Sequence, residues 1–314
     1  MHTTKIEGMK ISPSLALSTA FFYALGYPIG ALAVRAATPG IVLLSRFVAS
    51  AVILACIATA LRLEWPRGKF AVHAAVVGVL SQGVQFVGCY QAMRLGVSPV
   101  LVALIIAMNP VLTAALATRA LGERLDRRRA ASVALAVLAI GAAFAGRLLD
   151  VGRIDAAVLW VVLAVFGLAG GGIYQQRYLT TGHPVASNAI GIVAAIVPAG
   201  VFTLLTKQEV TNAPQAVWMV AILVVANSVV AATLYMAAIK QAGAAAVSLL
   251  FGIIPSMAAL LSWAIMGERP DLGVVVGLVI GAAACFLGIR RRGARSTPVE
   301  NEASRRPRES SSSA

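Results

Sequence analysis

The chain has 314 residues, of which 59% are hydrophobic and only 12% are charged, whereas ordinary globular proteins carry about 25% charged residues. The mean hydropathy of +0.86 excludes an ordinary soluble domain. The formal net charge of +14 would suit nucleic acid, but no soluble module is present that could display it. The composition therefore predicts a polytopic helical membrane protein that binds no nucleic acid.

Apolar segments of about 18 to 25 residues, each long enough to cross a bilayer, predict ten membrane-spanning helices. In chain order they cover residues 14–34, 40–61, 71–93, 97–121, 128–146, 155–176, 185–205, 215–239, 243–266 and 271–289. The first is expected to stay on the protein, because its apolar run is too long for a cleaved signal peptide. The polar, serine-rich stretch 294–314 predicts a disordered cytoplasmic tail.

Basic residues concentrate in alternate connections. With the N-terminus inside, about 15 Lys and Arg flank the inner side of the membrane, against six on the outer side. The six are Arg35, Arg94, Arg147, Arg153, Lys207 and Arg269. This bias predicts a multi-pass protein of the bacterial inner membrane with both termini in the cytoplasm.

The second half of the chain repeats the first at an offset of 145 residues. The offset carries Pro110 onto Pro255 and the Gly-Glu-Arg run 122–124 onto 267–269. Further pairs are Pro39 with Pro184, Gln82 with Asn227, and Tyr90 with Tyr235. Repeats of this kind surround one site in many transporters.

Two repeats follow from this offset, one over residues 1–150 and one over residues 151–293. Each would hold five spanning helices. Because five is odd, the second repeat would enter the membrane upside down relative to the first. The expected fold is therefore an all-α membrane protein of two inverted five-helix repeats.

Each half ends in a proline-bearing helix, and about eleven residues after the proline comes Gly-Glu-Arg. This pattern resembles the EamA domain of the drug/metabolite transporter superfamily, here present twice over nearly the full chain. In general character the chain is most similar to the YddG-type aromatic and amino-acid exporters. The resemblance implies an alternating-access exporter or facilitator of small organic metabolites, amino acids above all. A monomer without cofactor is expected.

Four amides fall at membrane depth, where a bare amide costs several kcal/mol unless it is hydrogen-bonded. They are Gln82, Gln85, Asn109 and Asn227. Together they could surround a midplane cavity that holds a zwitterion or another polar solute. The alternative is hydrogen bonding between helices, worth about 0.6–2 kcal/mol per pair.

Arg46 is the one basic residue well inside an apolar segment. An intramembrane arginine is costly and is by default a candidate for function. It could bind a substrate carboxylate or lock two helices through backbone carbonyls. Because it lies about a turn and a half from the outer helix end, snorkelling to the interface is the competing interpretation.

Aromatic residues supply further candidates. Tyr90 and Tyr235 lie near helix ends, where tyrosine usually belongs to the interfacial belt, although a role in gating is open. Trp263 could line an outer vestibule. Weaker candidates are Tyr23, Tyr27 and Tyr174.

The paired prolines predict kinks in the fourth and ninth helices, because proline removes a backbone hydrogen bond inside a helix. Pro110 and Pro255 could bend gating helices or simply serve packing. The Gly-Glu ends that follow would sit near opposite gates. These are Gly122 and Glu123 in the first repeat, and Gly267 and Glu268 in the second.

No acidic residue falls at the predicted midplane, where proton-coupled carriers commonly hold a relay. Facilitated diffusion or exchange is therefore favoured over proton coupling. Three cysteines in separate segments lack metal-binding spacing, so no metal is expected. The alternative function, a membrane-embedded enzyme acting on lipid or lipid-linked substrates, would need a catalytic set that the sequence does not display.

Overall fold

The computed structural model describes residues 11–120 and 156–267 continuously, and single positions within 131–138 and 269–280. Every regular element in these residues is helical, and one isolated bridge joins Ala37 to Val210. Seven helices are long and apolar enough to cross a membrane, or eight if a bent pair is counted as one span. For the described residues, these findings confirm the expected helical fold with several helices able to span a membrane.

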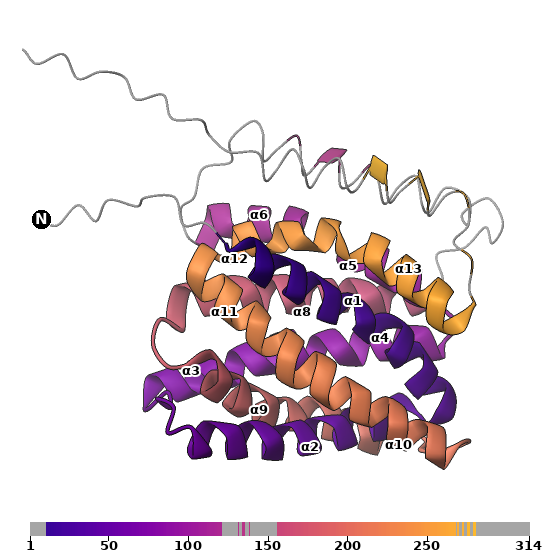
Figure 1. Cartoon of the computed structure of the whole chain (residues 1–314), viewed down its shortest axis with the longest axis horizontal. Helices are drawn as coiled ribbons and strands as arrows, with labels where there is room; N and C mark the ends of the chain where they lie inside the picture. The colour runs from indigo at the N-terminus through magenta and orange to yellow at the C-terminus, as the bar shows by residue number, and fades with distance from the viewer. Residues whose placement is uncertain are drawn as a thin grey trace, which may run out of the picture.

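The first half supplies four of these spans (Figure 1). The elements are α1 (Pro13–Ala36), α2 (Pro39–Ala60), α3 (Lys69–Gly78), η1 (Val79–Val84), α4 (Gln85–Arg94), α5 (Pro99–Ile106) and α6 (Asn109–Ala120). The run α3–η1–α4 forms a single span, as does most of the pair α5–α6.

The second half follows the same order. Its elements are α8 (Ala156–Tyr178), α9 (Pro184–Leu205), α10 (Ala213–Ile222), η2 (Leu223–Ala231), α11 (Ala232–Ala242), α12 (Ala244–Ser248), η3 (Leu249–Gly252) and α13 (Ile254–Met266). The predicted fifth and tenth helices, the tail 294–314, and Gly122, Glu123 and Glu268 lie largely or wholly outside the described residues. The count of ten and the inversion stay predictions.

Helix starts follow from capping side chains and prolines. The Ser12 hydroxyl accepts a hydrogen bond from the Leu15 backbone N–H at 3.4 Å, and Pro13 opens α1. The same Ser-Pro pair, Ser98 and Pro99, opens α5. Proline lacks only an N–H that would be unpaired in the first turn, so it marks where a helix begins.

The predicted kinks are breaks between helices. Pro110 lies at the second position of α6, after α5 has ended at Ile106, and Pro255 lies in the first turn of α13. At the second break, Ala244–Gly252 and Ile254–Met266 are bent by 40°. Because each proline opens a new helix, neither interrupts the hydrogen bonding of a helix interior.

The spans Lys69–Arg94 and Ala213–Ala242 each contain a π-helical stretch, η1 and η2, at matching places in the two halves. A π turn carries one extra residue and is frequently found at functional sites. Gln82 lies in η1 and Asn227 lies in η2.

Two glycines let the halves cross closely. A Cβ at Gly26 of α1 would overlap the Asn227 amide of η2, and a Cβ at Gly171 of α8 would overlap the Ser81 hydroxyl of η1. Gly26 and Gly171 are themselves 145 residues apart. Small residues are what allow membrane helices to approach this closely.

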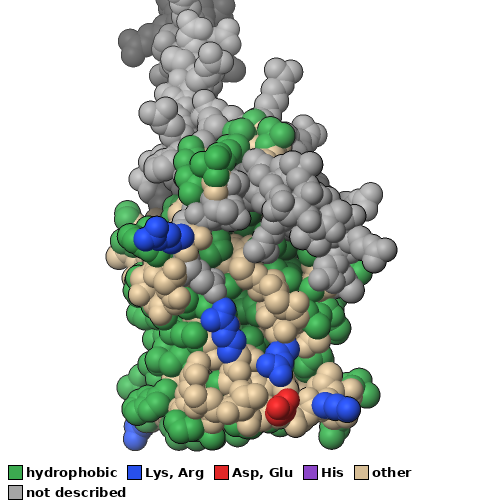
Figure 2. Space-filling model, turned by 90° about the vertical axis from the view of Figure 1, so that its right-hand side faces the viewer, with side chains coloured by type: hydrophobic (Ala, Val, Ile, Leu, Met, Phe, Trp, Pro, Cys, Tyr) green, Lys and Arg blue, Asp and Glu red, His purple; other side chains and the backbone are tan. Residues whose placement is uncertain are grey.

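The connections gather at two ends of the bundle. One, the Glu209 end, carries the α1–α2, α4–α5 and α9–α10 connections and lies on the right of Figure 1. Figure 2 shows it, with basic side chains and an acidic one among apolar and uncharged groups. The other, the Glu64 end, joins the α2–α3 and α8–α9 connections, where the His183 N–H donates to the Glu64 carbonyl at 3.1 Å.

We expect Gly26→Ala to destabilise the protein, because its methyl group would displace Asn227 from a fixed position. Overpacking of this kind costs about 1–3 kcal/mol. The apparent melting temperature in detergent should fall by several degrees. Gly170→Ala in α8 is the matched control, since a Cβ there meets nothing within 4 Å. Equal melting temperatures for the two variants would contradict a tight α1–η2 crossing.

Candidate functional site

Arg46 of α2 is fully buried, with 0% of its surface exposed. Its Nε donates to the Ser228 hydroxyl at 2.6 Å, and Nη1 donates to the Tyr90 hydroxyl at 2.7 Å. Its Nη2 donates to the Asn227 side-chain oxygen, also at 2.7 Å. The guanidinium therefore joins α2, α4 and η2 through side chains, and it neither snorkels nor binds backbone carbonyls in the described contacts.

Aromatic rings surround the same cation. The guanidinium carbon lies 4.0 Å from the centroid of the Phe86 ring, with the rings of Phe47 and Tyr90 at 5.6 and 5.7 Å. A desolvated cation–π contact of this kind contributes about 2 kcal/mol. The aromatic rings and the hydrogen-bond acceptors stabilise the positive charge of Arg46, but they carry no negative charge that would neutralise it.

No carboxylate faces Arg46 among the described residues. The acidic side chains there are Glu64 and Glu209, which are both exposed and lie at opposite ends of the bundle. A guanidinium has five N–H groups, and described hydrogen bonds engage three of those on Arg46. A buried charge held only by neutral partners is costly. The positive charge of Arg46 is therefore without a counter-ion among the described residues.

The partners of Arg46 are themselves held in place. The Asn227 amide donates to the Phe22 carbonyl of α1 at 3.3 Å. Asn188 of α9 donates to the Ser228 backbone carbonyl at 2.8 Å. A Cβ at Gly30 of α1 would lie 2.9 Å from the Tyr90 ring, so glycine makes room for that ring.

A small cavity of about 10 Å³ adjoins this cluster, close to the minimum that holds one water. It lies between α1, α4 and η2, and its lining includes Tyr23, Tyr27, Gln85, Phe86, Tyr90 and Asn227. The Tyr23 hydroxyl lies close enough to the Gln85 side chain to interact with it, but within the described part of the chain neither that hydroxyl nor the Gln85 side-chain oxygen has a hydrogen bond of normal geometry. Gln85 and Asn227, both predicted for a central cavity, thus line the same one.

Tyr23 also connects the cavity to the second predicted tyrosine. Its ring lies 5.5 Å from that of Tyr235 and 5.3 Å from that of Phe251. Tyr90 and Tyr235 are both buried, at 1% and 4% exposure. The expectation that they belong to the interfacial belt is wrong, because both rings are packed within the bundle.

The other predicted residues lie apart from Arg46 in the described contacts. Gln82 is buried in η1 and its side-chain oxygen has no described partner. The Asn109 oxygen accepts from the Thr113 hydroxyl at 3.1 Å. Trp263 is 54% exposed on α13. Gly267 adopts a left-handed φ of 71° at the end of α13, a conformation that glycine tolerates.

Sequence reasoning missed Ser228, Phe86 and the glycine pair of α1. Ser228 directly follows the predicted Asn227, and Phe86 follows the predicted Gln85. The spacing Gly26-x-x-x-Gly30 within an apolar segment is a known packing signal. That signal could have marked α1 as a close neighbour of other helices, although it could not name them.

A larger apolar groove of about 560 Å³ lies between α2 and α10–η2. The Ser45 hydroxyl on its wall is turned back onto the Ile41 carbonyl at 2.6 Å. At the matching place in the other half, α3 and α9 are packed backbone to backbone, with a Cβ on Gly191 only 3.1 Å from the Gly78 Cα. One seam is therefore open where its counterpart is closed.

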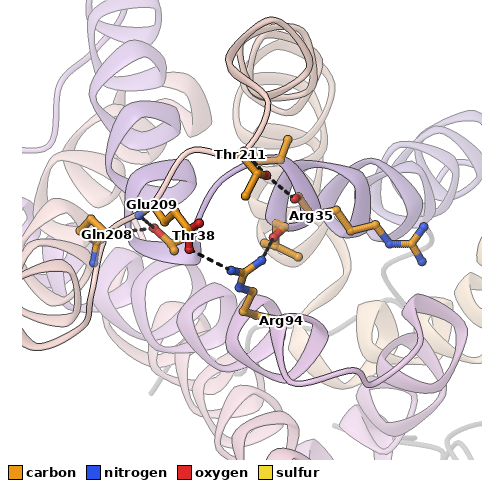
Figure 3. A network of polar contacts seen from close by, with 8 residues as sticks. Arg35, Thr38, Arg94, Gln208, Glu209 and Thr211 are labelled. Atoms are coloured by element: carbon orange, nitrogen blue, oxygen red, sulfur yellow. Dashed lines mark hydrogen bonds and ion pairs between the residues drawn. The ribbon is translucent and has the colours of Figure 1, made fainter.

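The Glu209 end is fastened by polar contacts (Figure 3). The Thr38 hydroxyl donates to the Gln208 side chain at 2.7 Å, and the Thr38 N–H donates to the Glu209 carbonyl at 2.9 Å. Arg94 donates to the Val34 carbonyl at 3.2 Å and lies 4.0 Å from the Glu209 carboxylate. These bonds join the α1–α2 corner to the α9–α10 loop and to the end of α4.

A model of the EamA-like transporter family matches this chain twice, over residues 10–145 and 155–290. The matches begin 145 residues apart, the same offset as the internal repeat. The uncharacterized transporter YyaM of Bacillus subtilis (strain 168) is 28% identical over 211 residues. Those residues cover 61% of this chain and 63% of YyaM, so less than two thirds of that relative is matched.

One solved crystal structure has the same fold. It superimposes with a TM-score of 0.67 at 16% identity and covers 88% of this chain and 97% of its own. This likeness concerns the fold alone. The two family matches show separately that the chain contains a duplicated unit.

We expect Tyr90→Phe to lower the apparent melting temperature, because it removes one charge-assisted hydrogen bond from a buried cation. Such a bond contributes about 1.5–3 kcal/mol. Tyr235→Phe is the matched control at the equivalent position, where the ring packs on Tyr23 and Phe251. A larger loss in Tyr235→Phe than in Tyr90→Phe would contradict the assigned role of the Tyr90 hydroxyl.

Proposed function

This chain belongs to the EamA-like transporter family, and we propose that it carries small organic carboxylates, amino acids above all, across the membrane. The proposal rests on one observation, the buried Arg46 that no described carboxylate neutralises. The family match supports transport, whereas a lipid-modifying reaction gains no support from it.

A substrate carboxylate is the group that best completes the Arg46 site. Guanidinium matches carboxylate in shape and can donate two parallel hydrogen bonds to it. Two charges 4 Å apart attract by about 4 kcal/mol at an effective dielectric constant of 20. A bound carboxylate would therefore offset part of the cost of keeping the guanidinium in the membrane interior.

The surroundings favour a substrate with an apolar or aromatic side chain. Rings of Tyr23, Tyr235 and Phe251 contact one another beside the cavity, and Phe86 and Tyr90 flank the cation. Stacked and edge-on aromatic contacts contribute about 0.5–1.5 kcal/mol beyond burial. We infer that amino acids with large apolar side chains are preferred over acidic or basic ones.

Alternating access is the mechanism we propose for two inverted repeats of residues 1–150 and 151–293. The open α2–α10 seam and the closed α3–α9 seam support it, because matching seams of the two repeats could exchange their open and closed arrangements during a transport cycle. No acidic side chain that could carry a proton with the substrate is described near Arg46. The carrier would therefore work by exchange or facilitated diffusion, as a monomer in the inner membrane with both termini in the cytoplasm.

The test is counterflow of radiolabelled phenylalanine in liposomes that contain the purified protein, with and without a pH gradient. We expect saturable uptake that ignores the gradient and falls at least about tenfold in Arg46→Gln, a loss equivalent to about 1.4 kcal/mol. Arg67→Gln, which removes an exposed arginine from the α2–α3 connection, is the matched control and should transport at nearly the normal rate.

Size-exclusion chromatography must show that both variants are folded. Equal transport by Arg46→Gln and the unaltered protein would overturn the assignment of the carboxylate site. Uptake driven by the pH gradient would overturn the proposed mode of transport. An absence of saturable uptake for phenylalanine and other apolar amino acids would overturn the substrate class.

A further inference from the structure

Two buried polar atoms, on neighbouring residues that line the small cavity, lack a hydrogen bond of normal geometry among the described residues. The Tyr23 hydroxyl comes from α1 and the Gln85 side-chain oxygen comes from α4, and their residues are 3% and 1% exposed. Leaving such a group unpaired costs about 1–3 kcal/mol. Two of them facing one cavity indicate that a hydrogen-bonding group occupies it.

We propose that Tyr23 and Gln85 form a recognition site for the protonated amino group of the substrate. This inference rests on the proposed function, because it assumes that the substrate carboxylate binds to Arg46. Under this proposal the cavity binds the amino group, which is the group that distinguishes α-amino acids from other carboxylates.

The size and chemistry of the cavity suit an ammonium group. Its volume of about 10 Å³ has room for one water-sized group. An ammonium group has similar dimensions and three N–H donors. The Gln85 oxygen and the Tyr23 hydroxyl both accept hydrogen bonds, and the aromatic rings of the lining suit a cation.

Charge limits which molecules can use the site. The cavity shares Phe86, Tyr90 and Asn227 with the surroundings of Arg46. The permanent positive charge of Arg46 repels an amine that arrives alone. In an α-amino acid the carboxylate enters with the ammonium group and offsets that repulsion. The site should therefore prefer zwitterions over simple amines and over carboxylates that lack an amino group.

Competition against phenylalanine counterflow tests this preference with three related compounds. They are unlabelled phenylalanine, 3-phenylpropionate, which lacks the amino group, and phenethylamine, which lacks the carboxylate. For the unaltered protein we expect phenylalanine to compete at least about tenfold better than 3-phenylpropionate, equivalent to about 1.4 kcal/mol. Phenethylamine should not compete.

Gln85→Leu removes the acceptor and keeps a side chain of similar bulk. We expect it to bring the ratio of the two affinities close to one, by weakening phenylalanine while leaving 3-phenylpropionate unchanged. Tyr23→Phe keeps the ring, removes the hydroxyl and should lower the ratio severalfold. If Gln85→Leu does not fold, Tyr23→Phe alone provides the test of the amino-group site. Gln91→Leu, the same change on the same helix but outside the described cavity lining, should keep the ratio of the unaltered protein.

The outcomes separate this inference from the proposed function. If Gln85→Leu and Tyr23→Phe keep the full ratio while Arg46→Gln loses transport, the cavity holds a water and the inference is overturned, although the carboxylate site stands. Effective competition by phenethylamine would also overturn it. If neither phenylalanine nor 3-phenylpropionate binds to the folded protein, the proposed function fails and this inference fails with it.

Discussion

A guanidinium inside a membrane protein must be provided with partners by the surrounding helices, and this requirement shapes the centre of the structure. Arg46 takes its three hydrogen-bond acceptors from two spans that are far apart in the sequence, α4 and η2. Those spans can reach it because α1 carries glycine where Asn227 and Tyr90 pass. The close packing of α1 against these spans is therefore what allows them to place hydrogen-bond acceptors around Arg46.

The internal duplication accounts for the arrangement of the helices. The Arg46 site arises where the two repeats differ in sequence. Both halves have a π-helical stretch in the third span, with Gln82 in one and Asn227 in the other. Arg46 occupies the position that Gly191 holds in the second half. Gly191 allows α9 to pack directly on α3, whereas Arg46 sends its side chain across to η2. A single difference between equivalent positions thus separates a packing contact from a charged site.

Sequence alone predicted the described spans well, because length, hydrophobicity and starting prolines are local signals. The eight predicted segments within the described ranges agree with the helices to within three residues at each end. Pro110 and Pro255 each lie at the start of a helix instead of inside one, and a bend of 40° accompanies the break before Pro255. The π turns have no comparable local signal and were missed.

The site was predictable only in part, because its geometry depends on contacts between distant segments. Arg46, Asn227 and Gln85 were all expected at membrane depth, since polar residues stand out there. The depth of a residue in the membrane does not predict which of the others its side chain contacts. Gln82 and Asn227 looked equivalent, yet the described contacts bring only Asn227 to Arg46. The sequence predicted an interfacial position for Tyr90, whereas in the structure its hydroxyl accepts a hydrogen bond from the Arg46 guanidinium.

The most direct measurement is the distance from a bound substrate carboxylate to Arg46. Solid-state NMR on liposomes can measure the dipolar coupling between carboxylate-13C phenylalanine and protein labelled with 15N-arginine, with Arg46→Lys protein as background. A hydrogen-bonded pair should place the carboxylate carbon about 3–4 Å from a guanidinium nitrogen. We predict that this coupling is present and vanishes in Arg46→Lys. Bound phenylalanine with no arginine coupling, or with the same coupling in both proteins, would contradict the account.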